Sequence, residues 1–168
     1  WVCTLIEDSE ELEAQSAEEL YKEISNSLPK VKVGLVHGRL KKDQKDSVIE
    51  KFRNGDIQLL VCTTVIEVGV DVPEATLMII ENPERLGLSQ LHQLRGRVGR
   101  GNKESSCILM FKAGLSENAR KRITILKNTN DGFKIAEEDL KIRGYGDILG
   151  FKQSGLKKYN LADPIQHE

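Results

Sequence analysis

The chain contains 168 residues, of which 39% are hydrophobic and 30% charged, and its formal net charge is −1. These values are typical of an ordinary soluble globular domain with room for a small appendage. No apolar run approaches membrane-spanning length and no secretory signal is recognisable, so we expect no association with a membrane. Trp1 leads directly into an apolar run without an initiator Met, so we expect a piece of a longer polypeptide.

The near-zero net charge conceals an uneven distribution of charged residues. The N-terminal end is acidic and contains Glu7, Asp8, Glu10, Glu11, Glu13, Glu18 and Glu19. The second half is locally basic and contains Arg95, Arg97, Arg100, Lys103, Arg120, Lys121 and Arg122. A basic patch on a nearly neutral protein favours a confined anion site over a general coating for nucleic acid.

The cysteines Cys3, Cys62 and Cys107 each lie in an apolar, strand-like run, and no pair has the spacing of a metal site or a redox site. We therefore expect three reduced, buried thiols of a cytosolic protein and no metal bound by them.

Apolar runs and turn residues predict that strands and helices alternate in the first two thirds of the chain. The predicted strands are residues 1–6, 31–36, 57–62, 76–81 and 106–111. A capping box at residues 16–19 predicts one helix start, and helical spacing predicts helices over residues 20–28, 43–54 and 88–98. This order favours an α/β fold with a parallel sheet, in which the strands at 57–62 and 76–81 are covered on both faces.

The pattern changes after residue 111. Ser116 is placed to cap a helix with an inner face of Ala119, Ile123 and Leu126. Asp131 is placed to start another, with an inner face of Phe133, Ala136 and Leu140. The two predict a helical hairpin. The glycine-rich residues 144–155 that follow are either a flexible tail or a docked loop that buries Ile148, Leu149 and Phe151.

The strand at 57–62 is followed by groups that bind phosphates and sugars. Ligands of doubly wound sheets bind beyond the carboxyl ends of the strands, so we expect Thr63, Gly69 and Asp71 on a functional edge there. The Thr63 hydroxyl can donate to a phosphate, Gly69 permits close backbone approach, and Asp71 can accept from ribose hydroxyls. The same residue types also suit a plain β-turn-β connection.

Residues 90–101 place three arginines within one or two helical turns and insert glycines beside two of them. Arginine is a fixed-charge, fork-shaped donor for phosphate oxygens, and glycine lets a ligand approach closely. The alternative is a solvated basic helix end. Because a matching segment lies just upstream, we expect Arg97 and Arg100 on the same functional edge as Thr63.

These two segments together resemble motifs V and VI of superfamily 2 helicases. His37 and Gly38, with Gln44 just beyond, resemble the segment that precedes motif V in the second RecA-like lobe. With residues 1–6, 81–93 and the tail that contains Gln153, the resemblance covers essentially the whole chain and extends to the RecG family of branched-DNA translocases. The related transcription-repair coupling factor Mfd is the alternative, although residues 1–6 and 161–163 favour RecG.

The resemblance implies a RecA-like helicase lobe of the P-loop NTPase type, with motifs IV, V and VI, over residues 1–113. A helical hairpin and a translocation tail then occupy residues 114–168. Arg97 and Arg100 would reach the γ-phosphate of ATP, with Gln93 beside them in the interface between lobes. The other implied roles are nucleotide binding by Gly69 and Asp71, DNA contacts by Thr63 and Gly38, and coupling by Arg122, Arg143 and Gln153.

Without the resemblance, Arg122 and Arg143 would be interpreted as ordinary helix-surface charges. His37 and His92 are interpreted as structural residues, with no role in proton transfer.

Two parts of a nucleotide site are missing from the sequence, namely a Gly-x-x-x-x-Gly-Lys-Ser/Thr loop and a strand-borne Asp-Glu pair for Mg²⁺. In the family, these belong to the first motor lobe, which a wedge domain precedes. The resemblance therefore implies half of an ATP site, with the Mg²⁺ ligands elsewhere, and half of a DNA track. It also implies two partners, namely branched double-stranded DNA and the rest of the polypeptide. The whole protein would be a monomer in the bacterial cytoplasm, at the nucleoid. A passive nucleic-acid-binding module is the alternative of a different class.

Overall fold

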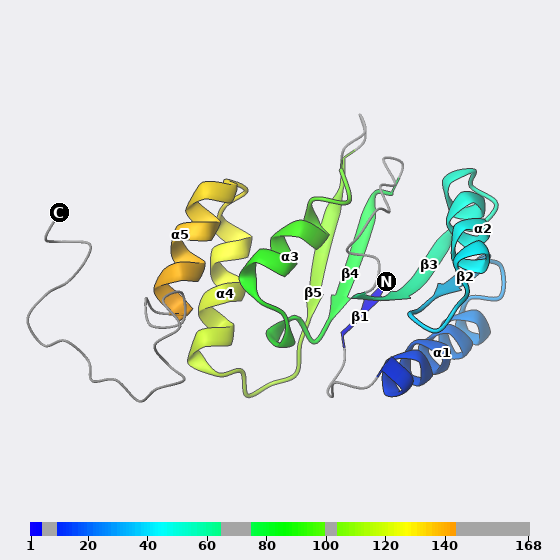
Figure 1. Ribbon diagram of the computed structural model, residues 1–168, viewed down its shortest axis with the longest axis horizontal. Helices are drawn as coiled ribbons and strands as arrows, with labels where there is room; N and C mark the ends of the chain where they lie inside the picture. The colour runs from blue at the N-terminus through cyan, green and yellow to red at the C-terminus, as the bar shows by residue number, and fades with distance from the viewer. Residues whose placement is uncertain (5–9, 65–74, 100–103, 144–168) are drawn as a thin grey trace, which may run out of the picture.

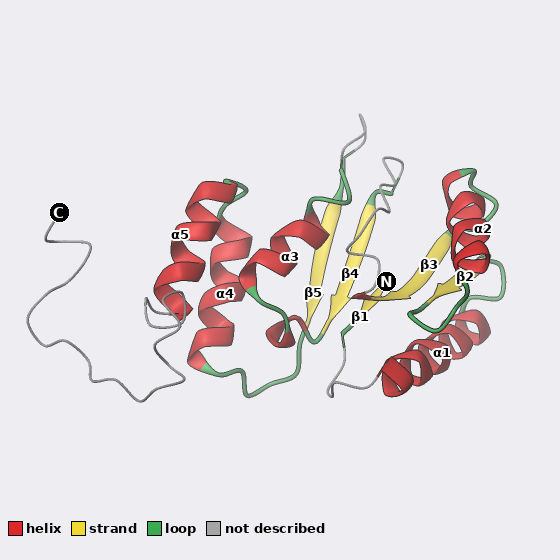
Figure 2. Ribbon diagram, in the orientation of Figure 1, coloured by secondary structure: helices red, strands yellow, loops and turns green. Residues whose placement is uncertain are grey.

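The computed structural model describes residues 1–4, 10–64, 75–99 and 104–143. In these ranges a single sheet of five parallel strands has the order β2-β3-β1-β4-β5 (Figures 1 and 2). The strands are β1 (Val2–Cys3), β2 (Val33–Val36), β3 (Leu59–Thr63), β4 (Leu77–Glu81) and β5 (Ser106–Met110). The helices are α1 (Glu10–Ser27), α2 (Lys42–Arg53), α3 (Leu88–Arg95), α4 (Glu117–Asn128) and α5 (Gly132–Arg143). The predicted α/β fold with a following helical hairpin is confirmed, and the irregular tail lies outside the described residues.

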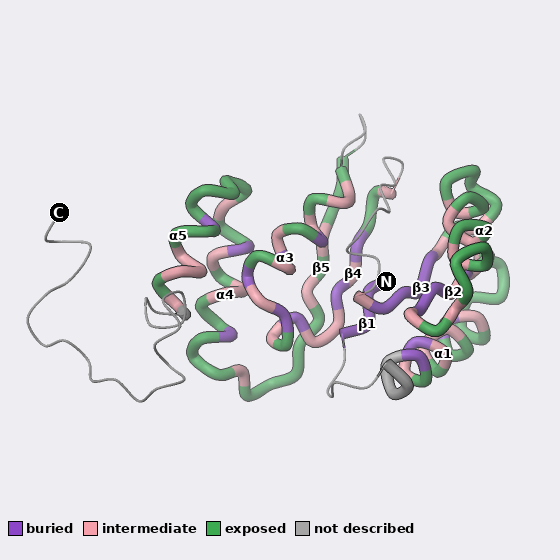
Figure 3. Tube along the Cα trace, viewed as in Figure 1, coloured by how far each residue is buried: buried purple, intermediate pink, exposed green. Residues whose placement is uncertain are grey.

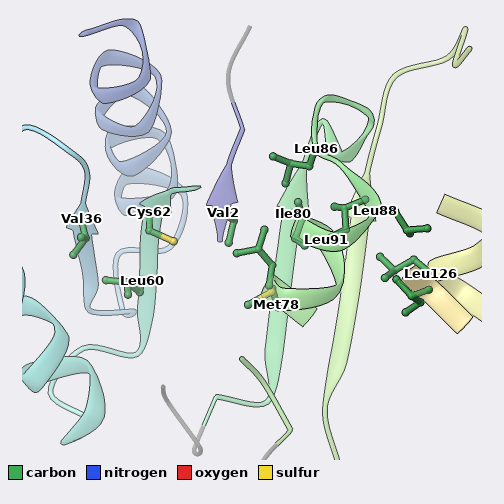
Figure 4. Packing of buried hydrophobic residues seen from close by; sticks show 12 residues of the cluster. Val2, Val36, Leu60, Cys62, Met78, Ile80, Leu86, Leu88, Leu91 and Leu126 are labelled. Carbon is green, nitrogen blue, oxygen red and sulfur yellow. The ribbon is translucent and has the colours of Figure 1, made fainter. Parts of the chain in front are cut away.

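Side chains on successive strand residues point to opposite faces of the sheet, so each face has its own core. One face packs against α2, α3 and the hairpin, and Figure 4 shows its buried residues converging from β1, β3, β4, α3 and α4. These include Val2, Leu60, Cys62, Met78, Ile80, Leu88, Leu91 and Leu126. The other face packs against α1 through Cys3, Val61, Ala17 and Ile24.

The β4–β5 end of the α1 face is not covered by any helix that the structure describes (Figure 3). Leu77 is 52% exposed, Ile108 46% and Met110 42%. The prediction that the strand at 76–81 is covered on both faces is therefore wrong. Among the residues that the structure describes, helices cover this strand pair on the α3 side, where Cys107 and Leu109 pack against the core.

Helix α1 starts at Glu10, well before the capping box predicted at residues 16–19, so that prediction of a helix start is wrong. Ala14 and Ala17 are both fully buried in α1. Their small side chains let the helix lie close to the sheet, and this packing outweighs the local preference of Ser16 for a cap.

Helix α4 has the predicted start and the predicted inner face. The Ser116 hydroxyl oxygen accepts a hydrogen bond from the backbone N–H of Ala119 at 3.3 Å, which satisfies one of the unpaired donors of the first turn. Ala119 and Leu126 are each only 2% exposed. This helix is thereby fixed against the rest of the core.

Helix α5 starts as predicted but presents a different face to the core. A carboxylate oxygen of Asp131 accepts from the backbone N–H of Phe133 at 2.9 Å, yet the Phe133 side chain is 91% exposed. Ile135 is buried instead and shares a cluster with Leu126. The segment has apolar residues on two overlapping stripes, and packing against its neighbours selects the stripe that contains Ile135.

Candidate functional site

The carboxyl ends of β1, β2 and β3 bring polar residues from distant parts of the sequence together. Val36 pairs with Cys62, and Cys3 pairs with Thr63. His37, Thr63 and Thr4 therefore lie side by side at this edge. Gly38 follows at once and is half-buried. Thr63 was expected at this edge, and the register places it there, with Gly38 nearby.

Thr63 and Thr4 differ sharply in their hydrogen bonding, although both are buried. The Thr4 hydroxyl lies 2.6 Å from the carbonyl oxygen of Glu81 and 2.9 Å from that of Asn82, and it donates to these oxygens. The Thr63 side chain is 0% exposed, and its hydroxyl has no partner among the described residues. Buried polar groups are nearly always paired, so a buried Thr63 hydroxyl without a partner among the described residues is unusual.

His37 adds a second buried atom without a described partner at the same edge. Its Nε2 lies 3.6 Å from a carboxylate oxygen of Glu18 on α1, while its Nδ1 is buried and has no described partner. The contact with Glu18 gives one of the two imidazole nitrogens a partner on α1, which agrees with a structural role for His37.

Lys45, which lies in the first turn of α2, was not among the residues predicted for the site. Its ammonium donates to the carbonyl oxygen of Gly38 at 2.8 Å, and the side chain is half-buried. This contact places a positive charge beside Gly38 at the carboxyl edge. The sequence indicates this role only by a lysine near the start of the helix that follows a His-Gly pair. A lysine that is merely exposed to solvent would produce the same pattern.

Arg97 lies at the opposite edge of the sheet from Thr63. It is half-buried and lines an apolar cavity of about 170 Å³ together with Phe52 and with Leu59 and Leu77, the first residues of β3 and β4. Helix α3 follows the carboxyl end of β4 and runs back across the sheet, so its final residues reach the amino ends of the strands (Figure 1). The prediction that Arg97 shares an edge with Thr63 is therefore wrong.

The three buried leucines of α3, namely Leu88, Leu91 and Leu94, hold this helix in place at 0–1% exposure. Gln93 lies on the outer side of α3 and is exposed. Gly99, two residues beyond Arg97, has a φ of +78°, a backbone conformation that only glycine adopts readily. The arginine-bearing segment thus follows a rigid helix and turns sharply at a glycine.

Arg95 does not face the cavity side of its segment but contacts the hairpin. Its Nη1 donates to the carbonyl oxygen of Leu126 and, at 2.9 Å, to that of Thr129. Its Nη2 lies 3.1 Å from His92 Nδ1. Burial lowers the pKa of Arg95 from its usual value.

Arg122 is also built into the fold. It is half-buried, and its Nη2 donates to the carbonyl oxygen of Glu84 at 2.8 Å. Glu84 lies in a short 3₁₀ helix, Pro83–Arg85, that follows β4. The alternative of an ordinary surface charge therefore does not apply to Arg122.

Five of the predicted site residues fall outside the described side chains. Arg143 is the last residue of α5, but its side chain is not described. The others are Gly69, Asp71, Arg100 and Gln153.

Among the described residues, no three His, Cys, Asp or Glu side chains are grouped so that they could hold a metal ion. No described helix is both long enough and apolar enough to cross a membrane.

Two families match the sequence. Residues 4–102 match the helicase conserved C-terminal domain, and residues 129–163 match the C-terminal part of domain 3 of the ATP-dependent DNA helicase RecG. The chain is 57% identical to RecG of Escherichia coli K12 over all 168 residues, which are 24% of that protein. It is 50% identical to RecG of Bacillus subtilis over 98% of this chain and 24% of that protein. The chain thus spans about a quarter of the length of these relatives.

Solved structures show the same likeness. A structure of RecG bound to a three-way DNA junction matches 94% of this chain and 20% of that chain, with a TM-score of 0.70 and 49% identity. The yeast DEAD-box splicing factor Prp28 matches 95% of this chain and 32% of that chain, with a TM-score of 0.60 and 17% identity, which bears on the fold alone. The RecA-like helicase fold expected from the sequence is confirmed.

Proposed function

Because this chain belongs to the helicase conserved C-terminal domain family and is 57% identical to a RecG helicase along its whole length, we propose that it is the second motor lobe of an ATP-dependent DNA helicase. ATP and Mg²⁺ are then held by a first motor lobe elsewhere in the same polypeptide, which the wedge domain precedes. The described residues fit this division, because they offer a cation beside a cavity.

The placement of Arg97 carries the proposal. Arg97 follows a helix that is anchored by three buried leucines, so we propose that its backbone is in position before a nucleotide arrives. Arg97 lies near Leu59 and Leu77, the first residues of β3 and β4, so we propose that a phosphate presented by another lobe approaches it from outside the sheet. Such preorganised donors stabilise charge that develops in a transition state, because no reorganisation is needed during the reaction.

Hydrolysis of ATP places negative charge on the oxygens of the transferred phosphoryl group. Arg97 and Arg100 donate N–H groups to these oxygens, an effect worth about 10³ to 10⁵ in rate for arginine fingers. Gln93 lies in the interface between the lobes, and Asp71 and Gly69, which come after β3 in the sequence, bind the nucleotide. These assignments follow the motif positions of the family.

The carboxyl edge forms the DNA side of the lobe. Thr63 and Gly38 contact the phosphate backbone, and Lys45 adds a charge beside Gly38. In this structure the Thr63 hydroxyl is fully buried, so it reaches a phosphate only when the surface above it opens. Its lack of a partner among the described residues supports this role, since a phosphate oxygen would supply one. Branched double-stranded DNA is the proposed substrate, in line with the relative bound to a three-way junction.

The nucleotide side and the DNA side lie on opposite edges of one sheet, so a movement of the lobe affects both at once. Arg122, Arg143 and Gln153 couple that movement to translocation, and the contact of Arg122 with Glu84 supports the first of these. The whole protein then acts as a monomer in the bacterial cytoplasm, at the nucleoid, and remodels replication forks and Holliday junctions in recombination and repair.

Two alternatives make different demands on the same residues. The corresponding lobe of Mfd is less favoured, because the relatives quoted above are RecG helicases. A passive DNA-binding module requires only positive charge at Arg97 and Arg100. Lysine is an adequate substitute in such a module but not in a motor, because lysine lacks the planar fork of donors.

The test is DNA-stimulated ATP turnover by the full-length protein with Arg97→Ala, Arg97→Lys and Arg100→Lys. Each should lower kcat by about 10²-fold or more, as loss of an arginine finger does. Arg120→Ala is the matched control, because Arg120 is exposed on α4, and it should leave kcat within a few-fold. Turnover that lysine sustains at the wild-type level would favour the passive module and reject the motor assignment.

A further inference from the structure

A tight turn joins β2, which lies at one end of the strand order, to helix α2 (Figure 1). The backbone N–H of Leu40 donates to the carbonyl oxygen of His37 at 3.2 Å and closes this turn. The peptide bond between Gly38 and Arg39 lies in the middle of the turn, where the closing hydrogen bond does not hold it. Gly38 has no Cβ atom to restrict rotation beside it. The direction of this peptide therefore depends on contacts from outside the turn.

Lys45 supplies such a contact from the first turn of α2. Its ammonium donates to the Gly38 carbonyl oxygen at 2.8 Å, a length typical of a hydrogen bond from a charged donor. The described residues contain no cis peptide bond. Because the C=O and N–H groups of a trans peptide point in opposite directions, the N–H of Arg39 points away from Lys45. One contact thus sets the direction of both polar groups of this peptide.

The Lys45 side chain is itself held against the protein. Val48 and Ile49, three and four residues further along α2, pack against the core, so Lys45 lies on the inner side of the helix. Lys45 is half-buried, whereas Lys41 and Lys42 are exposed. A lysine whose stem lies along apolar surface directs its ammonium to a defined place. Lys45 is therefore suited to hold one particular carbonyl oxygen.

We propose that Lys45 is a positioning residue for DNA, which fixes the Gly38–Arg39 peptide in the direction that admits a backbone phosphate and does not itself hold that phosphate. This inference rests on the proposed function, in which Gly38 contacts the phosphate backbone at the carboxyl edge. Backbone anion sites are built from N–H groups that face the anion. A carbonyl oxygen turned toward a phosphate would repel it, and the bond from Lys45 prevents that rotation.

The affinity of the full-length protein for a three-way DNA junction, measured over a series of salt concentrations, separates positioning from direct contact. The variants are Lys45→Met and Lys45→Arg, and Lys42→Met is the control that loses the same charge at an exposed position. Methionine keeps an unbranched stem and removes the ammonium. Lys45→Met should weaken binding by about tenfold at every salt concentration. Lys42→Met should change the affinity by less than about twofold.

The salt dependence identifies what Lys45 contacts. The slope of log affinity against log salt should be the same for Lys45→Met and Lys42→Met, because neither variant loses a phosphate contact. A slope smaller in magnitude by about 0.9 in Lys45→Met than in Lys42→Met would show that Lys45 binds a phosphate directly, and it would overturn the inference. Wild-type affinity of Lys45→Met would also overturn it, because the stem alone would then be sufficient.

Lys45→Arg tests whether a charged donor restores the contact. Arginine can donate to the Gly38 carbonyl oxygen, so this variant should bind the junction within about threefold of the wild type. ATP turnover at saturating junction should keep its kcat within about twofold in both Lys45 variants, while the junction concentration for half-maximal turnover rises about tenfold in Lys45→Met. An arginine variant that binds as weakly as Lys45→Met, or a loss of kcat in both variants, would show a merely structural role and overturn the inference. A wild type that does not bind the junction would instead reject the proposed function itself.

Discussion

Replacement of Thr63 by valine should stabilise the fold while it weakens DNA binding. The Thr63 hydroxyl is completely buried and has no described partner. A buried donor without an acceptor costs about 1–3 kcal/mol of stability. Valine has nearly the same shape and no hydroxyl, so Thr63→Val should raise the free energy of unfolding by about 1–2 kcal/mol. The affinity of the full-length protein for branched DNA should fall, because valine cannot donate to a phosphate.

Thr4→Val is the matched control at the same edge of the sheet. Thr4 is 4% exposed, and its hydroxyl lies 2.6 Å from the Glu81 carbonyl oxygen. Valine would leave that acceptor without its donor, so the free energy of unfolding should fall by about 1–2 kcal/mol. The two threonines therefore have opposite predicted signs for the same chemical change.

Urea unfolding of the chain with each substitution measures both signs, provided that the slope with denaturant stays constant. A Thr63→Val variant that is less stable than wild type by more than about 0.5 kcal/mol would refute the reasoning, since its hydroxyl would then be satisfied in the folded chain.

Three further outcomes are expected. The isolated chain should release no phosphate from ATP above background, with or without branched DNA, because the first lobe holds the nucleotide; turnover that copurifies with the chain would contradict this. Leu91→Ala should lower the free energy of unfolding by about 2–5 kcal/mol, because Leu91 is 0% exposed, while Leu77→Ala, at a residue 52% exposed, should cost much less by the same urea assay. Burial raises the pKa of Cys3 from 9.0 to about 12 and that of Cys62 to about 11, so stability should fall as pH rises above 9 toward 12, because the unfolded chain then releases thiol protons that the folded chain retains. Urea unfolding at several pH values measures this effect, and below pH 9 these thiols should not change the free energy of unfolding with pH.

The sequence identified the strands and helices well where local and tertiary preferences agree. The strand predicted at 57–62 became β3 (Leu59–Thr63), and the helix predicted at 43–54 became α2 (Lys42–Arg53). The start of α1 was missed, because burial of Ala14 against the sheet extends the helix past its local capping signal. The face of α5 was missed, because only contact with neighbouring helices selects Ile135 over Phe133.

The site was predictable in its residue types but not in its geometry. Thr63 ends β3 and Gly38 lies two residues beyond β2, so the parallel topology alone places them at the carboxyl edge. Arg97 comes after helix α3. The edge of the sheet at which Arg97 lies therefore depends on how far α3 extends back across the sheet, and no sequence motif specifies that length. The contacts of Arg95 with Leu126 and Thr129 were not predictable. Their acceptors are backbone carbonyl oxygens more than 30 residues away, and nothing in the sequence distinguishes Arg95 from the arginines that follow it.

The most direct test of the central claim is the affinity of the full-length protein for ADP and for ADP with a metal-fluoride mimic of the transferred phosphoryl group. If Arg97 acts on charge that develops in the transition state, Arg97→Ala should weaken binding of the mimic by about 10³-fold. Affinity for ADP should stay within a few-fold, because ADP has no γ-phosphate for Arg97 to contact. Equal weakening of both ligands, or of neither, would contradict the assignment of Arg97 as an arginine supplied to ATP by this lobe.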